Sequence, residues 1–337
     1  MIGLMRKIFG KIKVFPPQSC SVVITTQCCL KCKMCYMWQS LQTDDELSFE
    51  ETKRIIDQAS ELLEGNREFI ISGGEPLLVP YVFELIEHAR KAGLKVIMPT
   101  NGFLLNDDYA RRLCEVGLDE LFISLDSQNH ETHDFLRGRE NVFYSIQNGI
   151  KLLDKYKKDL RVNFLTVISN KNYSEIIDHL HTIKRDKRIS GVYFQAVAAP
   201  FFTNAGSDWR ENKKFSFLWP EKTAEINKVI DEIIRLKKEE NYPVHNSVEQ
   251  LKFFKKYFKD PYQRIGAPGC ILGERVLNVD PQGNISLCCF NEPVGNIRKN
   301  SLSEVWYSDS ANKERKWMRN CNKNCHNTVN CFFEDEA

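Results

Sequence analysis

Three cysteines near the start of the chain, Cys28, Cys32 and Cys35, stand with three and then two residues between them. Thiolates at this spacing can all reach one metal centre. A four-iron cluster that is held by only three cysteines keeps one iron without a protein ligand, and a small molecule can chelate an iron left open in this way. A zinc site is the alternative, since Cys32 and Cys35 form the C-x2-C half of a zinc-binding pair.

Glycines and polar residues further along the chain could complete a site around such a centre. Gly73, Gly74 and Glu75 follow a β-branched run. Glycines let the backbone approach a ligand closely, and the Glu75 carboxylate can accept hydrogen bonds from an ammonium group. Ser124 and Asp126 end a later run, where alternate residues of a strand share one face.

Asn101 and Arg137 are two further candidates, each with an ordinary alternative. Asn101 is either a turn residue before Gly102 or a hydrogen-bond donor to a cofactor. The guanidinium of Arg137 can hold a carboxylate by two parallel bonds, or it forms a surface pair with Asp134 three residues earlier. Gln195 is a weaker candidate for contact with a substrate.

The twelve cysteines fall into two groups, 20–35 and 270–331, with Cys114 alone between them. Clustered cysteines in a chain without a secretory signal indicate metal or redox chemistry in a reducing cytoplasm rather than disulfides. The two groups therefore predict two metal sites. Cys20, Cys29 and Cys114 are not expected to be ligands.

The elements that must position these residues alternate regularly. Strands separated by helices of ten or more residues imply βαβ units and a parallel sheet. Six units do not complete an eight-stranded barrel, so we expect an α/β fold with an open, partial (β/α)6 TIM-like barrel, whose chemistry lies at the C-terminal ends of the strands. The predicted strands are 21–25, 69–72, 95–98, 120–125, 161–168 and 191–197, and the predicted helices are 48–63, 82–92, 107–116, 142–156 and 173–184.

Beyond the barrel, the pattern predicts two helices at 221–238 and 248–258 and then a hairpin. The hairpin joins 275–279 to 284–289 through a turn that contains Pro281 and Gly283. Ser301 and Glu304 form a capping box for a helix at 302–307. The expected division is an N-terminal extension (1–19), the barrel (20–218), linking helices (219–263) and a small α+β module (264–337).

Composition excludes several classes of protein. The net charge of +2 over 337 residues gives no reason to expect a nucleic-acid partner, and 42% hydrophobic residues indicate a globular chain. No run approaches the roughly eighteen apolar residues that a membrane span needs. We expect a cytoplasmic protein.

The segment from Cys28 to Tyr36 resembles the cluster loop of the radical S-adenosylmethionine (radical SAM) superfamily. Gly73-Gly74-Glu75-Pro76 is similar to the family motif that receives the amino group of the cofactor, and the stretch 133–139 is similar to a family stretch in which Arg137 is the matching arginine. The resemblance implies a [4Fe–4S] cluster on Cys28, Cys32 and Cys35. It also implies cofactor contacts by Tyr36, Gly73, Gly74, Glu75, Asn101, Ser124, Asp126 and Arg137.

The second cysteine group resembles the auxiliary-cluster module of the SPASM and twitch subfamilies. That module has seven or so cysteines when it is complete, whereas six are present here, which favours one auxiliary [4Fe–4S] cluster. A structural zinc site that includes His326 is the alternative. The expected ligands are Cys270, Cys288, Cys321 and Cys325, with Cys331 as the alternative fourth ligand.

The resemblance implies reductive cleavage of SAM to a 5′-deoxyadenosyl radical, which abstracts hydrogen from a substrate. It also implies an electron donor such as flavodoxin or ferredoxin. Only 27 residues precede Cys28, which favours a small-molecule or cofactor-precursor substrate (a sugar, cyclitol or tetrapyrrole) over a peptide. A peptide-modifying maturase remains the alternative enzyme, and a non-catalytic iron–sulfur or zinc protein is the alternative of another class.

Overall fold

The structure is a computed structural model that describes residues 14–40, 45–203, 205–206, 208–262 and 270–331. Residues 1–13 of the expected N-terminal extension, and the expected boundary between residues 263 and 264, lie outside this part of the chain.

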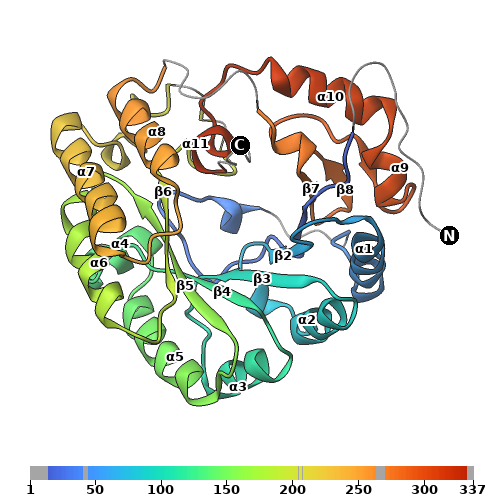
Figure 1. Cartoon of the computed structure of the whole chain (residues 1–337), viewed down its shortest axis with the longest axis horizontal. Coiled ribbons are helices and arrows are strands. Elements are labelled where there is room, and N and C mark those ends of the chain that lie inside the picture. The colour runs from blue at the N-terminus through green and yellow to red at the C-terminus, as the bar shows by residue number, and fades with distance from the viewer. Residues whose placement is uncertain (1–13, 41–44, 204, 207, 263–269, 332–337) are drawn as a thin grey trace.

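Six parallel strands form the centre of the fold and curve into an open barrel (Figure 1). They follow one another in the sheet in chain order, and a helix connects each strand to the next, so the predicted partial barrel is confirmed. The strands are β1 (Ser19–Val23), β2 (Glu68–Ser72), β3 (Lys95–Thr100), β4 (Glu120–Ser124), β5 (Arg161–Ile168) and β6 (Gly191–Ala196). The helices around them are α1 (Phe49–Leu62), α2 (Val82–Lys91), α3 (Asp107–Glu115), α4 (His130–Arg137), α5 (Val142–Tyr156) and α6 (Ile176–Arg185).

The first strand begins and ends two residues earlier than predicted. Cys20 and Val22 are buried in it, and Ser19 pairs with Glu68 of β2. Thr25 and Thr26 look like strand residues in the sequence, but their hydroxyls donate to the Glu46 carboxylate, at 3.1 and 2.9 Å. This polar contact takes the chain out of the sheet before the cysteine loop.

Two helices, α7 (Thr223–Glu240) and α8 (Val248–Lys259), follow β6 and pack against each other. The remaining elements are β7 (Val276–Val279), β8 (Asn284–Ser286), β9 (Gly295–Asn296), α9 (Leu302–Trp306), α10 (Asp309–Arg319) and α11 (His326–Asn330). Short 3-10 turns lie at Met37–Gln39, Pro76–Leu78, Tyr173–Glu175, Ser216–Leu218 and Leu272–Glu274. None of the helices in the described part of the chain is long and apolar enough to cross a membrane.

The C-terminal module extends the sheet of the barrel. Strand β7 pairs parallel with β1, and β8 and β9 continue antiparallel, so that nine strands form one sheet. The predicted hairpin is present, and the Asp280 carboxylate accepts hydrogen bonds from the backbone N–H groups of Gln282 (2.9 Å) and Asn284 (2.8 Å) in its turn. The capping box of Ser301 and Glu304 is confirmed as well.

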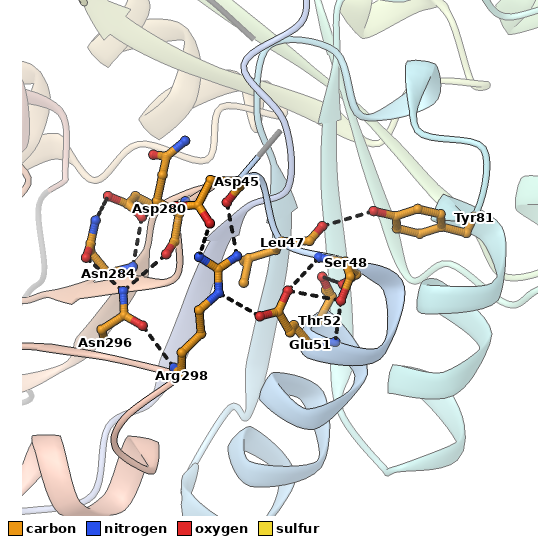
Figure 2. A network of polar contacts seen from close by, with 11 residues as sticks. Asp45, Leu47, Ser48, Glu51, Thr52, Tyr81, Asp280, Asn284, Asn296 and Arg298 are labelled. Atoms are coloured by element: carbon orange, nitrogen blue, oxygen red, sulfur yellow. Dashed lines mark hydrogen bonds and ion pairs between the residues drawn. The ribbon is translucent and has the colours of Figure 1, made fainter. Parts of the chain in front are cut away.

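Arg298 ties the module to the segment that leads from the cysteine loop into α1 (Figure 2). Its guanidinium lies 2.5 Å from the Asp45 carboxylate and 2.6 Å from that of Glu51. The Leu47 backbone N–H donates to the Pro281 carbonyl over 2.7 Å. The module therefore supports the chain immediately after the cysteine loop.

The opposite edge of the barrel is attached to the module by Asn330, at the end of α11. Its side-chain amide accepts from the backbone N–H of Ala196 (2.8 Å) and donates to the carbonyl of the same residue (2.9 Å), much as a neighbouring strand would. The Tyr193 hydroxyl donates to the Asn330 carbonyl over 2.7 Å. The module thus contacts both edge strands of the six-stranded barrel, β1 and β6.

Candidate functional site

The loop after β1 brings Cys28, Cys32 and Cys35 to the wall of one cavity of about 140 Å³. Cys32 is buried and the other two are half-buried. Burial raises the pKa of Cys28 to about 12 and that of Cys35 to about 11, so that these thiols keep their protons at neutral pH unless a metal replaces them. Three thiols around one small cavity fit a cluster that is held by three cysteines.

Gly73 and Gly74 let the loop after β2 pack directly on the chain that enters the cysteine loop. A Cβ atom on Gly73 would lie 2.5 Å from the carbonyl oxygen of Thr25, and one on Gly74 would lie 2.1 Å from that of Gln27. Backbone hydrogen bonds from Gly74 to Thr25 (2.9 Å) and from Glu75 to Gln27 (2.8 Å) hold this contact. Both glycines line the cavity, so their backbone is available to a ligand there.

The Glu75 carboxylate is not part of the cavity wall and faces the end of β3 instead. It is fully buried and accepts hydrogen bonds from the Thr100 hydroxyl (2.8 Å) and from the backbone N–H groups of Asn101 (2.8 Å) and Leu77 (3.1 Å). Burial raises the pKa of Glu75 to about 7, against the effect of these hydrogen bonds. Glu75 therefore fixes the loops after β2 and β3 to each other, and its contact with an ammonium group stays a prediction.

Asn101 lines the cavity, and its side chain also stabilises the turn that follows β3. Its side-chain oxygen accepts from the Phe103 backbone N–H (2.9 Å), as in a turn. Its amide nitrogen lies 3.8 Å from the Cys28 sulfur and 3.4 Å from the Cys29 sulfur. The Cys29 side chain is not part of the cavity wall. Asn101 therefore supplies an N–H donor beside the expected cluster ligands.

Arg137 and Asp126 form a buried ion pair beside Cys32. The Arg137 guanidinium lies 2.8 Å from the Asp126 carboxylate and is also a hydrogen-bond partner of the Cys32 thiol. Ser124 and Arg137 line the cavity, whereas Asp126 is fully buried behind it. The Nε atom of Arg137 has no hydrogen-bond acceptor among the described residues, so one donor of this arginine is left for a bound group.

The alternative partner of Arg137 was Asp134, three residues earlier on α4. That surface pair is not formed, because Arg137 points into the fold and the Asp134 carboxylate accepts from the Phe143 backbone N–H instead (2.9 Å). The way α4 packs on the sheet determines which carboxylate pairs with Arg137, and the spacing of residues in the sequence does not reveal that packing.

The end of α4 carries the cysteine loop. Gly138 caps the helix with φ of +66°, and a Cβ atom there would lie 2.1 Å from the Lys31 carbonyl oxygen. The Lys33 backbone N–H donates to the Leu136 carbonyl (2.8 Å), and Arg139 donates to the Cys29 carbonyl (2.9 Å). The stretch 136–139 therefore fixes the backbone between the three cysteines.

A second cavity of about 150 Å³ adjoins the first, and Cys35, Ser124 and Arg137 line both. Its other walls are mostly apolar and come from the ends of β5 and β6. Gln195 from β6 and His326 from α11 add polar groups. Burial lowers the pKa of His326 to about 4, so that its imidazole is neutral at physiological pH. The sequence signal for His326 was its position beside Cys325, which suggested a metal ligand rather than a cavity wall.

Tyr36 is not part of either cavity wall. Its backbone N–H donates to the Phe201 carbonyl (2.9 Å), and its ring packs edge-on against Phe215 with the ring centres 5.6 Å apart. Tyr36 supports the end of the cysteine loop in this structure, and its contact with a cofactor stays a prediction.

The second group of cysteines gathers in the C-terminal module. Burial, with a smaller contribution from the neighbouring thiols of Cys325, Cys288 and Cys321, raises the pKa of Cys270 to about 11. The four expected ligands therefore lie near one another.

Cys289 and Cys331 complete this group. Burial raises the pKa of Cys331 to about 12, and the nearby thiols of Cys289 and Cys325 add to this increase. The Asn327 amide lies between the two, 3.4 Å from the Cys289 sulfur and 4.0 Å from that of Cys331. Cys289 is one of the six cysteines counted in the module, but it is not among the expected ligands.

Sequence models of two families match the chain. The radical SAM superfamily matches residues 22–183, and the SPASM family, an iron–sulfur cluster-binding domain, matches residues 270–331. The chain is therefore an enzyme of the radical SAM superfamily, which uses SAM and a [4Fe–4S] cluster. Within that superfamily it belongs to the members with a SPASM domain, which binds auxiliary iron–sulfur clusters. Each group of cysteines falls inside one of the two matches.

Three similar proteins illustrate the range of the family. An AdoMet-dependent heme synthase of Methanosarcina barkeri is 36% identical over 154 residues, which are 45% of this chain and 43% of that protein. An Fe-coproporphyrin III synthase of the same organism is 26% identical over 84% of this chain and 72% of its own length. The structure of anSMEcpe with bound AdoMet and a peptide matches with a TM-score of 0.67 and 19% identity, over 94% of this chain and 88% of that one. The likeness to that structure concerns the fold.

Proposed function

We propose that this enzyme uses SAM to remove a hydrogen atom from a small-molecule substrate of the cofactor-precursor class. The observation that supports this most directly is the pair of adjoining cavities, because one is bordered by the three cysteines and both share Cys35, Ser124 and Arg137. When bound, the cluster and SAM supply an electron and a 5′-deoxyadenosyl radical. A substrate in the second cavity would lie next to the place where that radical is released.

The residues of the chain would bind, orient and shield these groups. Cys28, Cys32 and Cys35 would hold the cluster. The backbone of Gly73 and Gly74 and the side chains of Asn101, Ser124 and Arg137 would face SAM, while Tyr36, Glu75 and Asp126 would keep the surrounding loops in place. Burial of this set excludes water, which a reactive radical requires.

The second cavity supports a substrate with an apolar body and few polar groups. Its wall includes Leu165, Val167 and the alanines at 196, 198 and 199, with Gln195 and His326 as hydrogen-bonding groups. A tetrapyrrole precursor is the first substrate to test, before sugars and cyclitols, because two of the similar proteins are named for haem-related tetrapyrroles; a molecule of that size, with its several carboxylates, would extend beyond this cavity of about 150 Å³.

The auxiliary cluster would sit behind this cavity. Cys270, Cys288, Cys321 and Cys325 would hold one [4Fe–4S] cluster, with Cys331 as the alternative fourth ligand. His326 follows Cys325 and lines the second cavity, so the module reaches the place proposed for the substrate. A cluster there is suited to accept an electron from the substrate, which gives a net oxidation.

All twelve cysteines are free thiols in the structure. This supports a reducing compartment, and we place the enzyme in the cytoplasm, where flavodoxin or ferredoxin would supply electrons.

The experiment that tests the proposal uses anaerobically reconstituted protein with SAM and dithionite. We expect about eight irons per chain and 5′-deoxyadenosine that is detected by mass spectrometry. Cys32→Ala should abolish the product, and Cys114→Ala, a cysteine on α3 away from both groups, should retain it. An intact cluster without 5′-deoxyadenosine, even with candidate substrates added, would instead favour the non-catalytic protein.

Peptides are the second candidate substrate, because the fold is shared with peptide-bound anSMEcpe. A cell extract distinguishes the two candidate substrates when its stimulation of SAM cleavage is measured before and after protease treatment of the extract. Stimulation that survives protease supports the small molecule, whereas stimulation lost to protease supports the peptide.

A further inference from the structure

The outer face of the cysteine loop carries lysines that no carboxylate neutralises. Lys31 and Lys33 flank Cys32 in the sequence, and Lys171 comes from the loop between β5 and the 3-10 turn before α6. Lys214 lies on the chain between β6 and α7. Within the described residues, none of these four lysines forms an ion pair.

Aromatic rings hold two of these ammonium groups beside α4. Lys33 lies 5.4 Å and Lys171 lies 5.7 Å from the centre of the Phe135 ring, which is 47% exposed. Lys171 also lies 5.8 Å from the ring centre of Phe217, whose ring packs edge-on against Phe135. Such contacts fix the position of a cation but leave its charge uncompensated.

The other two lysines are held in the same way by the aromatic residues that follow Cys35. Lys31 lies 5.7 Å from the ring centre of Trp38, and Lys214 lies 4.4 Å from that of Tyr36. We call the four lysines together with Phe135 and Phe217 the basic patch. Lys31 and Lys33 belong to the cysteine loop and flank the buried Cys32 in the sequence, and the rings of Tyr36 and Trp38, whose centres lie 5.8 Å apart, connect Lys31 with Lys214.

A groove that carries both acidic and basic side chains borders the basic patch on one side. Glu131, Asp134 and Glu140 line this groove of about 550 Å³ together with Lys33 and Arg139. These carboxylates lie on α4 and just beyond it and share the groove with Lys33, so the positive charge of the basic patch rests mainly on Lys31, Lys171 and Lys214.

We propose that the basic patch is the docking surface for an acidic one-electron carrier protein. The inference rests on the proposed function, since a cluster in the cysteine loop must receive an electron from outside. One electron leaves the carrier, which is oxidised by one electron, and reduces the metal centre by one, while no bond or proton is exchanged. Unpaired lysines attract an acidic partner from a distance, and the exposed Phe135 provides an apolar centre for the contact.

Charge reversal tests the surface without catalysis. The probe is oxidised flavodoxin, an acidic carrier, and its binding to the reconstituted enzyme is measured by titration at low and high salt. Lys171→Glu and Lys33→Glu should weaken flavodoxin binding about tenfold or more at low salt. At high salt the affinity of the wild type should fall to nearly that of the variants. Lys187→Glu is the matched control, because Lys187 is exposed in the connection between α6 and β6, at the opposite end of the barrel strands, and this variant should bind like the wild type.

A kinetic measurement separates this inference from the proposed function. With flavodoxin and its reductase as the electron source, Lys171→Glu should raise the flavodoxin KM for 5′-deoxyadenosine formation about tenfold, whereas with dithionite it should match the wild type. A wild type that fails with dithionite contradicts the proposed function, and the binding titration still tests the patch. Equal flavodoxin binding by wild type and both variants would overturn the docking surface and leave an acidic peptide or an anionic lipid surface as its occupant. Circular dichroism confirms that each variant is folded.

Discussion

The Arg137 guanidinium lies 2.8 Å from the Asp126 carboxylate, and the pair is buried next to the thiol of Cys32. Burying two charges is costly, and their attraction offsets this cost only while both are present. The cysteine loop therefore packs against a buried ion pair, and removal of either partner should destabilise the fold there.

Arg137→Ala should lower the free energy of unfolding by about 3–5 kcal/mol, because it leaves the Asp126 carboxylate buried without its partner. Urea unfolding of the apoprotein measures this, and iron content after reconstitution should fall with it. Arg111→Ala is the control, since its ion pairs with Asp108 and Glu115 are exposed and should matter little. Equal stability of the two variants would show that the buried pair is not needed.

Gly74→Ala should prevent the loop after β2 from packing on the cysteine loop, because its Cβ would lie 2.1 Å from the Gln27 carbonyl oxygen. We expect a loss of about 1–3 kcal/mol and incomplete loading of the three-cysteine cluster, measured as iron and sulfide per chain. The control for cluster loading is Gly65→Ala, which carries the backbone strain of a φ of +69° but has no atom nearer than 3.9 Å to a Cβ, so it should lose some stability and still load its iron fully. Full iron content in Gly74→Ala would contradict the prediction.

Arg298→Ala should loosen the C-terminal module from the chain after the cysteine loop. The Arg298 guanidinium, together with the Ser48 backbone, lowers the pKa of Glu51 to about 2. Because this pKa is below the unfolded value, the stabilisation is complete above about pH 4.5 and disappears as the pH falls toward 2. The difference in unfolding free energy between wild type and variant should therefore be about 1–2 kcal/mol at pH 7 and should shrink toward pH 3.

Arg319→Ala is the matched control for that experiment, because its ion pair with Glu274 lies inside the module. A wild-type advantage over Arg298→Ala that is as large at pH 3 as at pH 7 would mean that the Glu51 carboxylate does not carry the contact.

Cys325→Ala should reduce the iron content from about eight to about four per chain, because it removes a ligand of the auxiliary cluster and leaves the SAM cluster in place. Cys114→Ala should keep the full content. Cys289→Ala answers a further question, since this thiol lies 3.4 Å from the Asn327 amide within the same group. Loss of iron in Cys289→Ala would add it to the ligands, whereas unchanged iron in Cys325→Ala would remove Cys325 from them.

Local signals were sufficient for most of the barrel. Strand β5 and helix α5 have the predicted bounds, because alternation of period two and an apolar stripe of period 3.6 are visible in a short window. Helix α10 was missed because its buried face consists of Ala311, Arg315 and Met318, which do not form an ordinary apolar stripe. Helix α11 spans only five residues and offers no period at all.

The site was predictable at the level of motifs and less so at the level of contacts. Cys28, Gly74 and Ser124 line the cavity, as residues at the ends of parallel strands should. The inward direction of Arg137 and the place of His326 depend on how α4 and α11 pack, and packing between elements far apart in sequence leaves no local pattern.

The pairing of β1 with both β2 and β7 has a consequence for how the chain is made. Strand β1 leaves the ribosome long before its second neighbour β7, because the rest of the barrel lies between them in the sequence. At ordinary translation rates, one edge of the nascent barrel stays unpaired for roughly tens of seconds, and Asn330, which covers the other edge, emerges later still. An unpaired strand edge invites association with other chains, so the newly made protein would depend on molecular chaperones until β7 and Asn330 have left the ribosome.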